Sequence, residues 1–219
     1  MIIAIDGPEA SGKGTVAKLI AKKYNLRHLD SGLLYRLTGV PLIGQKFNNN
    51  AEFEAQAIKA AGQINAAQLD SPPEIARTMQ GGVMASKVAV IPQVRDILTA
   101  IQKNIAKQKP GAVIDGRDIG TVVFPNAELK FWVTASIESR ASRRFAEYQA
   151  KGRSDSLAAV SQAIAERDHR DSSRAASPMV RAQDAHLIET SKLSIEGVVE
   201  ALSVFIDAKL ADLKGSSQN

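Results

Sequence analysis

Short apolar runs alternate along the chain with longer stretches in which apolar residues recur every three or four positions. Short runs are typical of buried strands, and the longer period is typical of amphipathic helices. The pattern predicts strands over residues 2–5, 26–29, 112–115, 129–133 and 186–188. It predicts helices near residues 13–24, 31–38, 92–107, 136–150 and 156–170. Because strands that alternate with helices favour βαβ units, we expect an α/β fold with a parallel five-stranded sheet flanked by helices.

The clearest helical pattern lies near the C-terminus. Its apolar residues are spaced so that they share one face of a helix. They are Ile195, Val198, Val199, Leu202, Phe205, Ile206, Leu210 and Leu213.

Residues 40–87 interrupt the alternation. They contain Ala- and Gln-rich helical pieces and Pro72-Pro73, and no convincing strand. We interpret them as a helical insertion that stands off the sheet. The alternative is a flexible linker, which the helical pattern over 51–67 disfavours. The prediction is one domain, residues 1–219, with a core of 1–39 and 88–219 and an insertion of 40–87.

The composition excludes several classes of protein. A chain of 219 residues with 44% hydrophobic and 23% charged residues is typical of a soluble globular domain. The absence of cysteine excludes disulfide frameworks, thiolate catalysis and Cys-ligated metals. No apolar run approaches the roughly 20 residues of a membrane helix. The apolar start meets Asp6 at once, unlike a signal peptide. We therefore expect a cytoplasmic protein.

The net charge of +5 is unevenly distributed. Residues 138–181 hold nine basic residues (eight arginines and Lys151) and six acidic ones, a net of +3. The planar fork of arginine suits bidentate recognition of phosphate. Aromatic residues, at 5%, are too sparse for an obvious base-stacking platform. The pattern favours a small phosphorylated ligand over a polynucleotide.

A glycine-rich segment follows the first predicted strand and opens the first predicted helix. It reads Gly7-Pro8-Glu9-Ala10-Ser11-Gly12-Lys13-Gly14-Thr15. In a phosphate-binding P-loop, backbone N–H groups and a helix N-terminus surround phosphate oxygens, and the lysine reaches the β and γ phosphates. We expect these nine residues to bind ATP and Lys13 to act in catalysis, within a P-loop NTPase fold. A glycine-rich turn with a chance lysine is the alternative, which the flanking strand and helix disfavour.

The hydroxyl that ligates Mg²⁺ normally follows this lysine directly. Here Gly14 takes that place and Thr15 comes next, as in the G-K-G-T variant of several nucleoside monophosphate kinases. Either the Gly14 backbone or the Thr15 side chain is expected beside the phosphates, and Thr15 is a candidate metal ligand. The loop alone does not separate kinases from motors and DNA-dependent ATPases, whereas the guanine-reading sequence N-K-x-D of GTPases is absent.

Two further polar segments follow predicted strands. Residues 30–36 read Asp-Ser-Gly-Leu-Leu-Tyr-Arg, and residues 115–118 read Asp-Gly-Arg-Asp. The carboxyl ends of parallel strands form the edge where open α/β folds bind ligands. Asp115 stands where a Walker-B carboxylate supports Mg²⁺, directly or through water. Arg117 and Asp118 are suited to hold a phosphate and a donor group of a base; solvated turns with capping residues are the alternative.

A third motif, Glu166-Arg167-Asp168-His169-Arg170-Asp171-Ser172-Ser173-Arg174, lies in the arginine-rich segment. Arg167, Asp171 and Arg174 share one helical face. A solvated helix with ion pairs accounts for the motif taken alone. Beside a P-loop, we interpret residues 151–174 as a short lid and take Arg170 and Arg174 as catalytic candidates that meet the transferring phosphoryl group.

Together these four motifs resemble bacterial cytidylate kinase, in order and spacing, from residue 2 to about 210. The resemblance implies Mg²⁺-dependent transfer of the γ-phosphoryl group of ATP to CMP or dCMP, giving CDP or dCDP in pyrimidine nucleotide metabolism. It implies a catalytic Arg117 as well, since Arg36 and Arg117 lie on the monophosphate in this family. It implies that the nucleotide is bound by Ser31, Tyr35, Arg36, Ser86, Arg95, Arg117, Asp118, Arg167 and Asp171, with Ser86, Arg95 and Asp118 reading cytosine. Arg174 would lie beside the phosphates.

The sequence departs from this family in the insertion. Family members usually carry a longer segment with a small antiparallel sheet before the serine matched by Ser86, and this chain has no matching strand signal. Gln80 stands where an acidic residue is common. The departures bear on cytosine selectivity and on closure, and the kinase motifs are unaffected.

The predicted reaction needs no strong general base, because the acceptor phosphate has a second pKa of about 6 and is largely dianionic at neutral pH. The three histidines, His28, His169 and His186, are therefore interpreted as structural. We expect a monomer acting on ATP and CMP or dCMP, with neither nucleic acid nor membrane as partner. Two alternatives stay open: a P-loop kinase for another acceptor such as AMP or shikimate, and a non-catalytic nucleotide-binding regulator that touches RNA.

Overall fold

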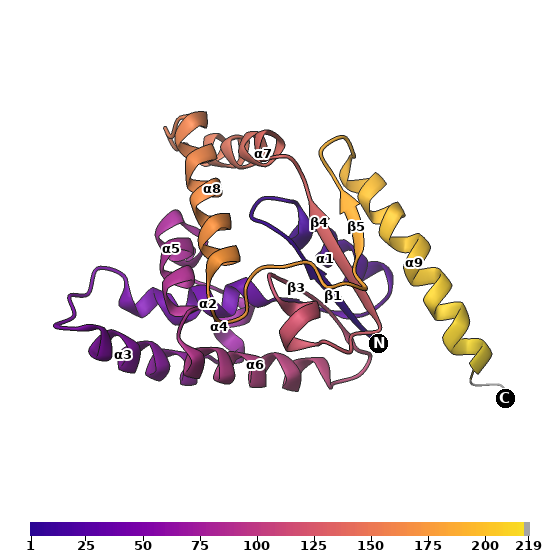
Figure 1. The fold of residues 1–219 in the computed structure, drawn as a ribbon, viewed down its shortest axis with the longest axis horizontal. Coiled ribbons are helices and arrows are strands. Elements are labelled where there is room, and N and C mark those ends of the chain that lie inside the picture. Colours follow the sequence, from indigo (N-terminus) through magenta and orange to yellow (C-terminus); the bar gives the residue numbers. More distant parts are fainter. Residues whose placement is uncertain (217–219) are drawn as a thin grey trace.

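The computed structural model describes residues 1–216, so residues 217–219 of the predicted domain lie outside the described residues. Its strands form one parallel sheet in the order β2-β3-β1-β4-β5. The strands are β1 (Ile2–Asp6), β2 (Arg27–Asp30), β3 (Ala112–Gly116), β4 (Leu129–Thr134) and β5 (His186–Glu189). This sheet, flanked by helices, confirms the predicted α/β fold and all five predicted strands (Figure 1).

The predicted helices are also present. The helices are α1 (Lys13–Lys23), α2 (Ser31–Gly39), α3 (Asn50–Gly62), α4 (Ala66–Asp70), α5 (Met79–Val88), α6 (Pro92–Ala106), α7 (Ile137–Ala150), α8 (Leu157–Ser173) and α9 (Ile195–Ser216). Short 3₁₀ turns cover Val40–Leu42 and Glu74–Arg77, and a π-helical turn covers Ile119–Val123. No helix within residues 1–216 is long and apolar enough to cross a membrane.

The helical pattern over 51–67 is divided between α3 and α4. Asn65 caps α4: its side chain accepts a hydrogen bond from the Gln68 backbone (3.1 Å), and the Gln68 side chain accepts one from the Asn65 backbone (3.0 Å). This reciprocal cap satisfies N–H groups at the start of a new helix. The helix is therefore interrupted before Ala66, although the apolar period of the sequence continues.

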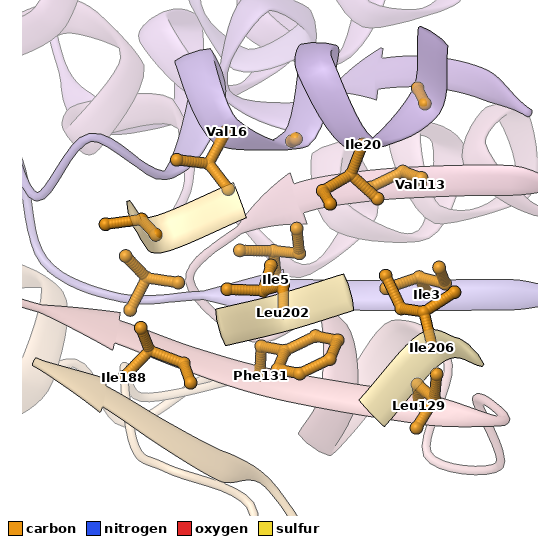
Figure 2. Packing of buried hydrophobic residues seen from close by; sticks show 14 residues of the cluster. Ile3, Ile5, Val16, Ile20, Val113, Leu129, Phe131, Ile188, Leu202 and Ile206 are labelled. Atoms are coloured by element: carbon orange, nitrogen blue, oxygen red, sulfur yellow. The ribbon is translucent and has the colours of Figure 1, made fainter. Parts of the chain in front are cut away.

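The two faces of the sheet carry different apolar packing because side chains alternate along each strand. Ile3 and Ile5 of β1 face α1 and α9, and Ala4 between them faces the other side, where the end of α6 and the π-helical turn lie. Figure 2 shows the first cluster, in which Phe131 of β4 lies against Leu202 of α9. Apolar side chains therefore pack against both faces of the sheet.

The insertion packs away from the sheet. Its buried residues, such as Ala57 of α3 and Ala85 of α5, form a cluster with Leu34 of α2 and Leu98 of α6, and no strand contributes to it. Figure 1 shows α3 at the end of the molecule opposite α9. Within residues 40–87, all of which the structure describes, there is no strand.

The strand register brings three polar segments to one edge. Asp6 at the end of β1 pairs with Gly116 of β3, and Asp30 at the end of β2 pairs with Asp115. The glycine-rich loop after β1 therefore lies beside the segments that follow β2 and β3. As predicted, all three meet at the carboxyl edge of the sheet.

Candidate active site

A cavity of about 1000 Å³ opens at this edge. It is lined by most of the residues that the sequence singled out. These are Glu9, Ala10, Gly12, Lys13, Gly14, Thr15, Ser31, Tyr35, Arg36, Ser86, Asp115, Arg117, Asp118, Arg167, Asp171 and Arg174. Five predicted residues do not line it: Gly7, Pro8, Ser11, Arg95 and Arg170.

The curl of the glycine-rich loop depends on two glycines. Gly7 has φ +154°, and a Cβ built there would lie 2.0 Å from the Val133 carbonyl oxygen of β4. Gly12 has φ +88° and stands at the N-cap of α1. Both conformations strain any L side chain, so glycine is required for the loop to turn from β1 into α1. The helix N-terminus consequently points its N–H groups into the cavity.

Lys13 is held at the floor of this loop. Its Nζ donates a hydrogen bond to the Pro8 carbonyl oxygen (3.0 Å) and its side chain is buried. Burial, with the nearby Arg117 guanidinium, lowers the pKa of Lys13 to about 7. A bound anion would favour the charged form, so the residue is poised to become cationic when phosphate enters the cavity.

Asp115 is oriented by a neighbouring strand. His28 of β2 places Nε2 2.8 Å from Asp115 Oδ1, and Ser31 Oγ donates to the Asp115 carbonyl oxygen (2.7 Å). The other carboxylate oxygen faces the start of α1, since a Cβ built on Gly14 would lie 3.4 Å from Asp115 Oδ2. This brings the carboxylate and the exposed Thr15 to the same wall of the cavity.

Asp115 and Thr15 supply oxygen atoms of the kind that Mg²⁺ prefers. Within residues 1–216, no three His, Cys, Asp or Glu side chains gather into a metal cluster. A magnesium ion at this wall would therefore be shared with substrate phosphates, which is its usual manner of binding.

Asp118 lies in a buried ion-pair network at the far wall. Its carboxylate pairs with Arg95 of α6, and Arg174 Nη2 lies 3.5 Å from its other oxygen. Arg95 is anchored behind the cavity by the Ser177 hydroxyl (3.0 Å) and the Ala89 carbonyl (3.2 Å). The predicted base-reading position Arg95 thus reaches the cavity only through Asp118.

The Tyr35 ring lies over this network, 5.6 Å from the Arg95 guanidinium carbon. Its hydroxyl is buried without a hydrogen-bond partner among the described residues. Burial raises the pKa of Tyr35 to about 12, so the hydroxyl keeps its proton and presents a donor at the cavity wall.

Arg117 is fixed by the lid helix. Its Nε donates to Asp171 of α8 (3.0 Å), and the Ser86 hydroxyl lies 3.5 Å from the other oxygen of Asp171. Burial by itself lowers the pKa of Arg117, but Asp171 and Glu9 outweigh it and the pKa is raised. Asp171 therefore joins three segments: the end of β3, the insertion helix α5 and the lid helix α8.

Arg36 connects α2 to the insertion. One nitrogen of its guanidinium donates to the carbonyl oxygens of Ala76 (2.8 Å) and Thr78 (3.1 Å). Arg36 also lines the cavity, and its Nη2 lies 3.9 Å from Glu9 Oε1.

Arg170 does not line the large cavity. Its side chain is 45% exposed and lies 3.9 Å from Glu166, one helical turn away. It lines a smaller cavity of about 300 Å³ between α5, α7 and α8, which shares Glu9, Arg36, Arg144 and Arg167 with the large one. Of the three arginines of α8, Arg174 lines the large cavity, Arg170 lines the smaller one, and Arg167 lines both.

Sequence reasoning missed the residues of α7 that contact the P-loop. Arg140 of α7 pairs with Asp168 of α8 and donates to the Glu9 carbonyl oxygen (3.1 Å). Arg143 donates to the Ser11 carbonyl (3.4 Å), and Arg144 to the Glu9 carboxylate (3.1 Å). The available signal was the spacing of Arg140, Arg143 and Arg144, which puts three arginines on neighbouring positions of one helix.

The fold and this cavity define a P-loop phosphotransferase with an arginine-rich site opposite the P-loop. The sequence matches the cytidylate kinase family over residues 3–207. It is 45% identical over 206 residues to the cytidylate kinase of Bartonella quintana, covering 94% of each chain. It is 46% identical over 211 residues to that of Xanthobacter autotrophicus, covering 96% of this chain and 99% of the relative. The chain belongs to the cytidylate kinase family.

Among solved structures, a crystal structure of an uncharacterized protein from Eubacterium ventriosum aligns over 94% of this chain and 98% of its own, with a TM-score of 0.53. At 14% sequence identity, this likeness concerns the fold alone.

Proposed function

We propose that the protein transfers the γ-phosphoryl group of ATP to CMP or dCMP, giving ADP and CDP or dCDP, in pyrimidine nucleotide metabolism. Membership of the cytidylate kinase family supports this reaction. The observation that carries it is that one cavity joins a P-loop lysine, Lys13, to a second wall of buried arginines and aspartates that suits a monophosphate and its base.

The ATP side comprises the loop of residues 7–15. Backbone N–H groups at the start of α1 surround the phosphates, and Lys13 neutralises charge on the β and γ groups. Lys13 donates to the Pro8 carbonyl oxygen, so its side chain is directed along the loop.

The acceptor side comprises the segments after β2 and β3 with α5 and α8. Arg36 and Arg117 hold the monophosphate, and Asp118 accepts from the amino group of cytosine with Arg95 behind it. The ring of Tyr35 and the hydroxyls of Ser31 and Ser86 line the same wall. Arg167 and Asp171 contact the ribose, and the buried Asp118 suits a role as acceptor rather than as base.

Magnesium fits the wall formed by Thr15 and Asp115, either directly or through water. When bound there, it would neutralise charge on the ATP phosphates. Asp115 is kept in place for this by His28 and Ser31, and it is the only carboxylate that the structure sets beside Gly14 among residues 1–216.

The chemistry rests on position and charge. The acceptor phosphate is itself the nucleophile and is largely dianionic at neutral pH, so no side chain has to remove a proton. Arg117, Arg170 and Arg174 stabilise the charge of the transferring group, and closure of the lid, residues 151–174, excludes water. Arg170 reaches that group only if α8 moves, since it now lines the smaller cavity.

The domain division stands as part of the proposal: a core of 1–39 and 88–219, a monophosphate-binding insertion of 40–87 and the lid. We further propose that the protein works in the cytoplasm as a monomer on small-molecule substrates.

The test is ADP release by the purified protein with Mg-ATP and one acceptor at a time: CMP, dCMP, UMP, AMP or shikimate. The proposal predicts strong stimulation by CMP and dCMP, weak stimulation by UMP and none by AMP or shikimate. Stimulation by AMP or shikimate alone would replace it with another kinase, and no stimulation by any acceptor would refute kinase activity.

A further inference from the structure

The Glu9 carboxylate lies among arginines from three helices. Its Oε1 is 2.7 Å from Arg167 Nη1 of α8, 3.1 Å from Arg144 Nη2 of α7 and 3.9 Å from Arg36 Nη2 of α2. Burial by itself raises the pKa of Glu9, but Arg167, Arg144 and their neighbours outweigh it and hold the pKa at about 2. The carboxylate is therefore charged at neutral pH.

The main chain of Glu9 is bound by α7 and by the lid helix α8. Its N–H donates to Asp168 Oδ1 of α8 (3.1 Å), and its carbonyl oxygen accepts from Arg140 Nη1 of α7 (3.1 Å). Arg140 and Asp168 also pair with each other. The tip of the P-loop is thus attached to the lid through side chain and backbone of a single residue.

These contacts fall where substrate phosphates must go. Glu9, Arg36, Arg144 and Arg167 all line the large cavity. Carboxylate and phosphate oxygens are alternative partners for the same guanidinium forks. The Glu9 oxygen accepts N–H groups of Arg144 and Arg167 that a phosphate oxygen could also accept.

One hydrogen-bond donor of this arginine cluster is unpaired among the described residues. Arg167 Nε is buried without a hydrogen-bond partner among the described residues, and the nearest carboxylate oxygen, on Asp171, is 3.9 Å away. A buried N–H of a charged group is costly to leave unpaired. The Arg167 Nε–H group can therefore donate to an incoming anion, next to the Nη1–H group that donates to Glu9.

We propose that Glu9 is a positioning residue. As an internal anion, it holds Arg36, Arg144 and Arg167, and with them α7 and the lid helix α8, when no substrate is bound, and it yields these arginines to a substrate phosphate. The inference rests on the proposed function in naming phosphate as the displacing group. Glu9 prevents mutual repulsion of the three arginines and keeps α7 and α8 against the P-loop, at the expense of competing with the first anion that binds.

The test uses the full-length protein and pyrophosphate as the probe. In Glu9→Gln, no carboxylate has to be displaced, so pyrophosphate binding measured by calorimetry should tighten by about tenfold. Without ligand, amide hydrogen exchange in α7 and α8 should become faster than in wild type, and saturating pyrophosphate should remove the difference.

Glu166→Gln is the matched control. Glu166 of α8 pairs with Arg170 (3.9 Å), its side chain is 55% exposed, and it does not line the large cavity. The control should leave both pyrophosphate affinity and lid exchange as in wild type.

A second variant keeps the inference testable if Glu9→Gln does not fold. Arg144→Gln removes one arginine of the cluster, so lid exchange should again be faster but pyrophosphate should bind more weakly. Unchanged affinity or unchanged exchange in Glu9→Gln would overturn the inference, as would tighter binding in Arg144→Gln. If wild type shows no CMP-stimulated ADP release while the variants shift as expected, the proposed function fails and the role of Glu9 stands.

Discussion

His28 Nε2 lies 2.8 Å from Asp115 Oδ1, so a residue of β2 orients the carboxylate near the end of β3 that faces the start of α1. Partners that orient a metal-binding carboxylate commonly change metal affinity by about 10- to 100-fold. His28→Leu should therefore raise the Mg²⁺ concentration for half-maximal ADP formation by about tenfold. Turnover at saturating Mg²⁺ should recover to near the wild-type value.

The control for this prediction is His169→Leu, which removes an exposed histidine of α8. Its Mg²⁺ dependence should match that of wild type. A His28 variant with a normal Mg²⁺ dependence and low turnover at every Mg²⁺ concentration would show that His28 acts elsewhere.

Replacing the P-loop lysine should separate activity from stability. Lys13→Met should lower turnover by at least about 100-fold, because charge stabilisation at the phosphates is lost. The fold should remain, since burial disfavours the lysine charge. ADP release and thermal unfolding of the same samples test this, and full turnover in the variant would remove the P-loop assignment.

The lysine also predicts a pH dependence of stability. Its pKa is lowered from 10.5 to about 7 in the folded protein, so between these pH values the unfolded chain binds more protons. The free energy of unfolding of wild type should therefore rise relative to Lys13→Met from about pH 7 to about pH 10.5. Parallel stability curves across that range would show that the lysine is not desolvated in the free protein.

Replacing Asp118 should weaken the binding of CMP far more than the binding of ATP. Asp118→Asn keeps one acceptor oxygen but loses the charge that pairs with Arg95 and Arg174. CMP affinity should fall by roughly 10- to 100-fold, whereas ATP affinity should change by less than about threefold. Calorimetric titrations measure both.

The control for Asp118 is Asp184→Asn, which removes the partner of another buried cation, Lys130 (2.8 Å), outside the cavity. It should leave CMP binding unchanged, whatever it does to stability. Equal loss of CMP and ATP affinity in Asp118→Asn would defeat the base-reading role.

Arg170 tests whether the lid moves. Since it lies outside the large cavity in the ligand-free protein, Arg170→Met should leave CMP and ATP binding unchanged. Turnover should nevertheless fall by about tenfold or more, because the arginine acts only on the transferring group. Unchanged turnover would remove Arg170 from the catalytic set.

The sheet and the edge where the site lies were predictable, because each strand is a short apolar run followed by its functional residues. Gly7 to Thr15 after β1 and Asp115 to Asp118 after β3 needed only the rule that parallel strands end at one edge. The break between α3 and α4 was missed because the Asn65 cap interrupts a continuous apolar period.

The contacts that tie the lid to the P-loop were not predictable from one sequence. Glu9 is 135 residues from Arg144 and 158 from Arg167, and no local spacing indicates that these side chains meet. His28 was interpreted as structural because a lone histidine in a strand carries no signal of the carboxylate that it orients. Arg170 and Arg174 were both taken as catalytic candidates, although Arg174 lines the large cavity and Arg170 lines the smaller one.

The measurement that tests the central claim most directly follows the γ-phosphoryl group itself. Purified protein is given Mg-ATP labelled at the γ phosphate together with CMP, and the labelled products are separated. The account predicts that the label appears in CDP in the same amount as ADP is formed. Label in inorganic phosphate with CMP unchanged would contradict it, since the protein would then be a nucleotide hydrolase.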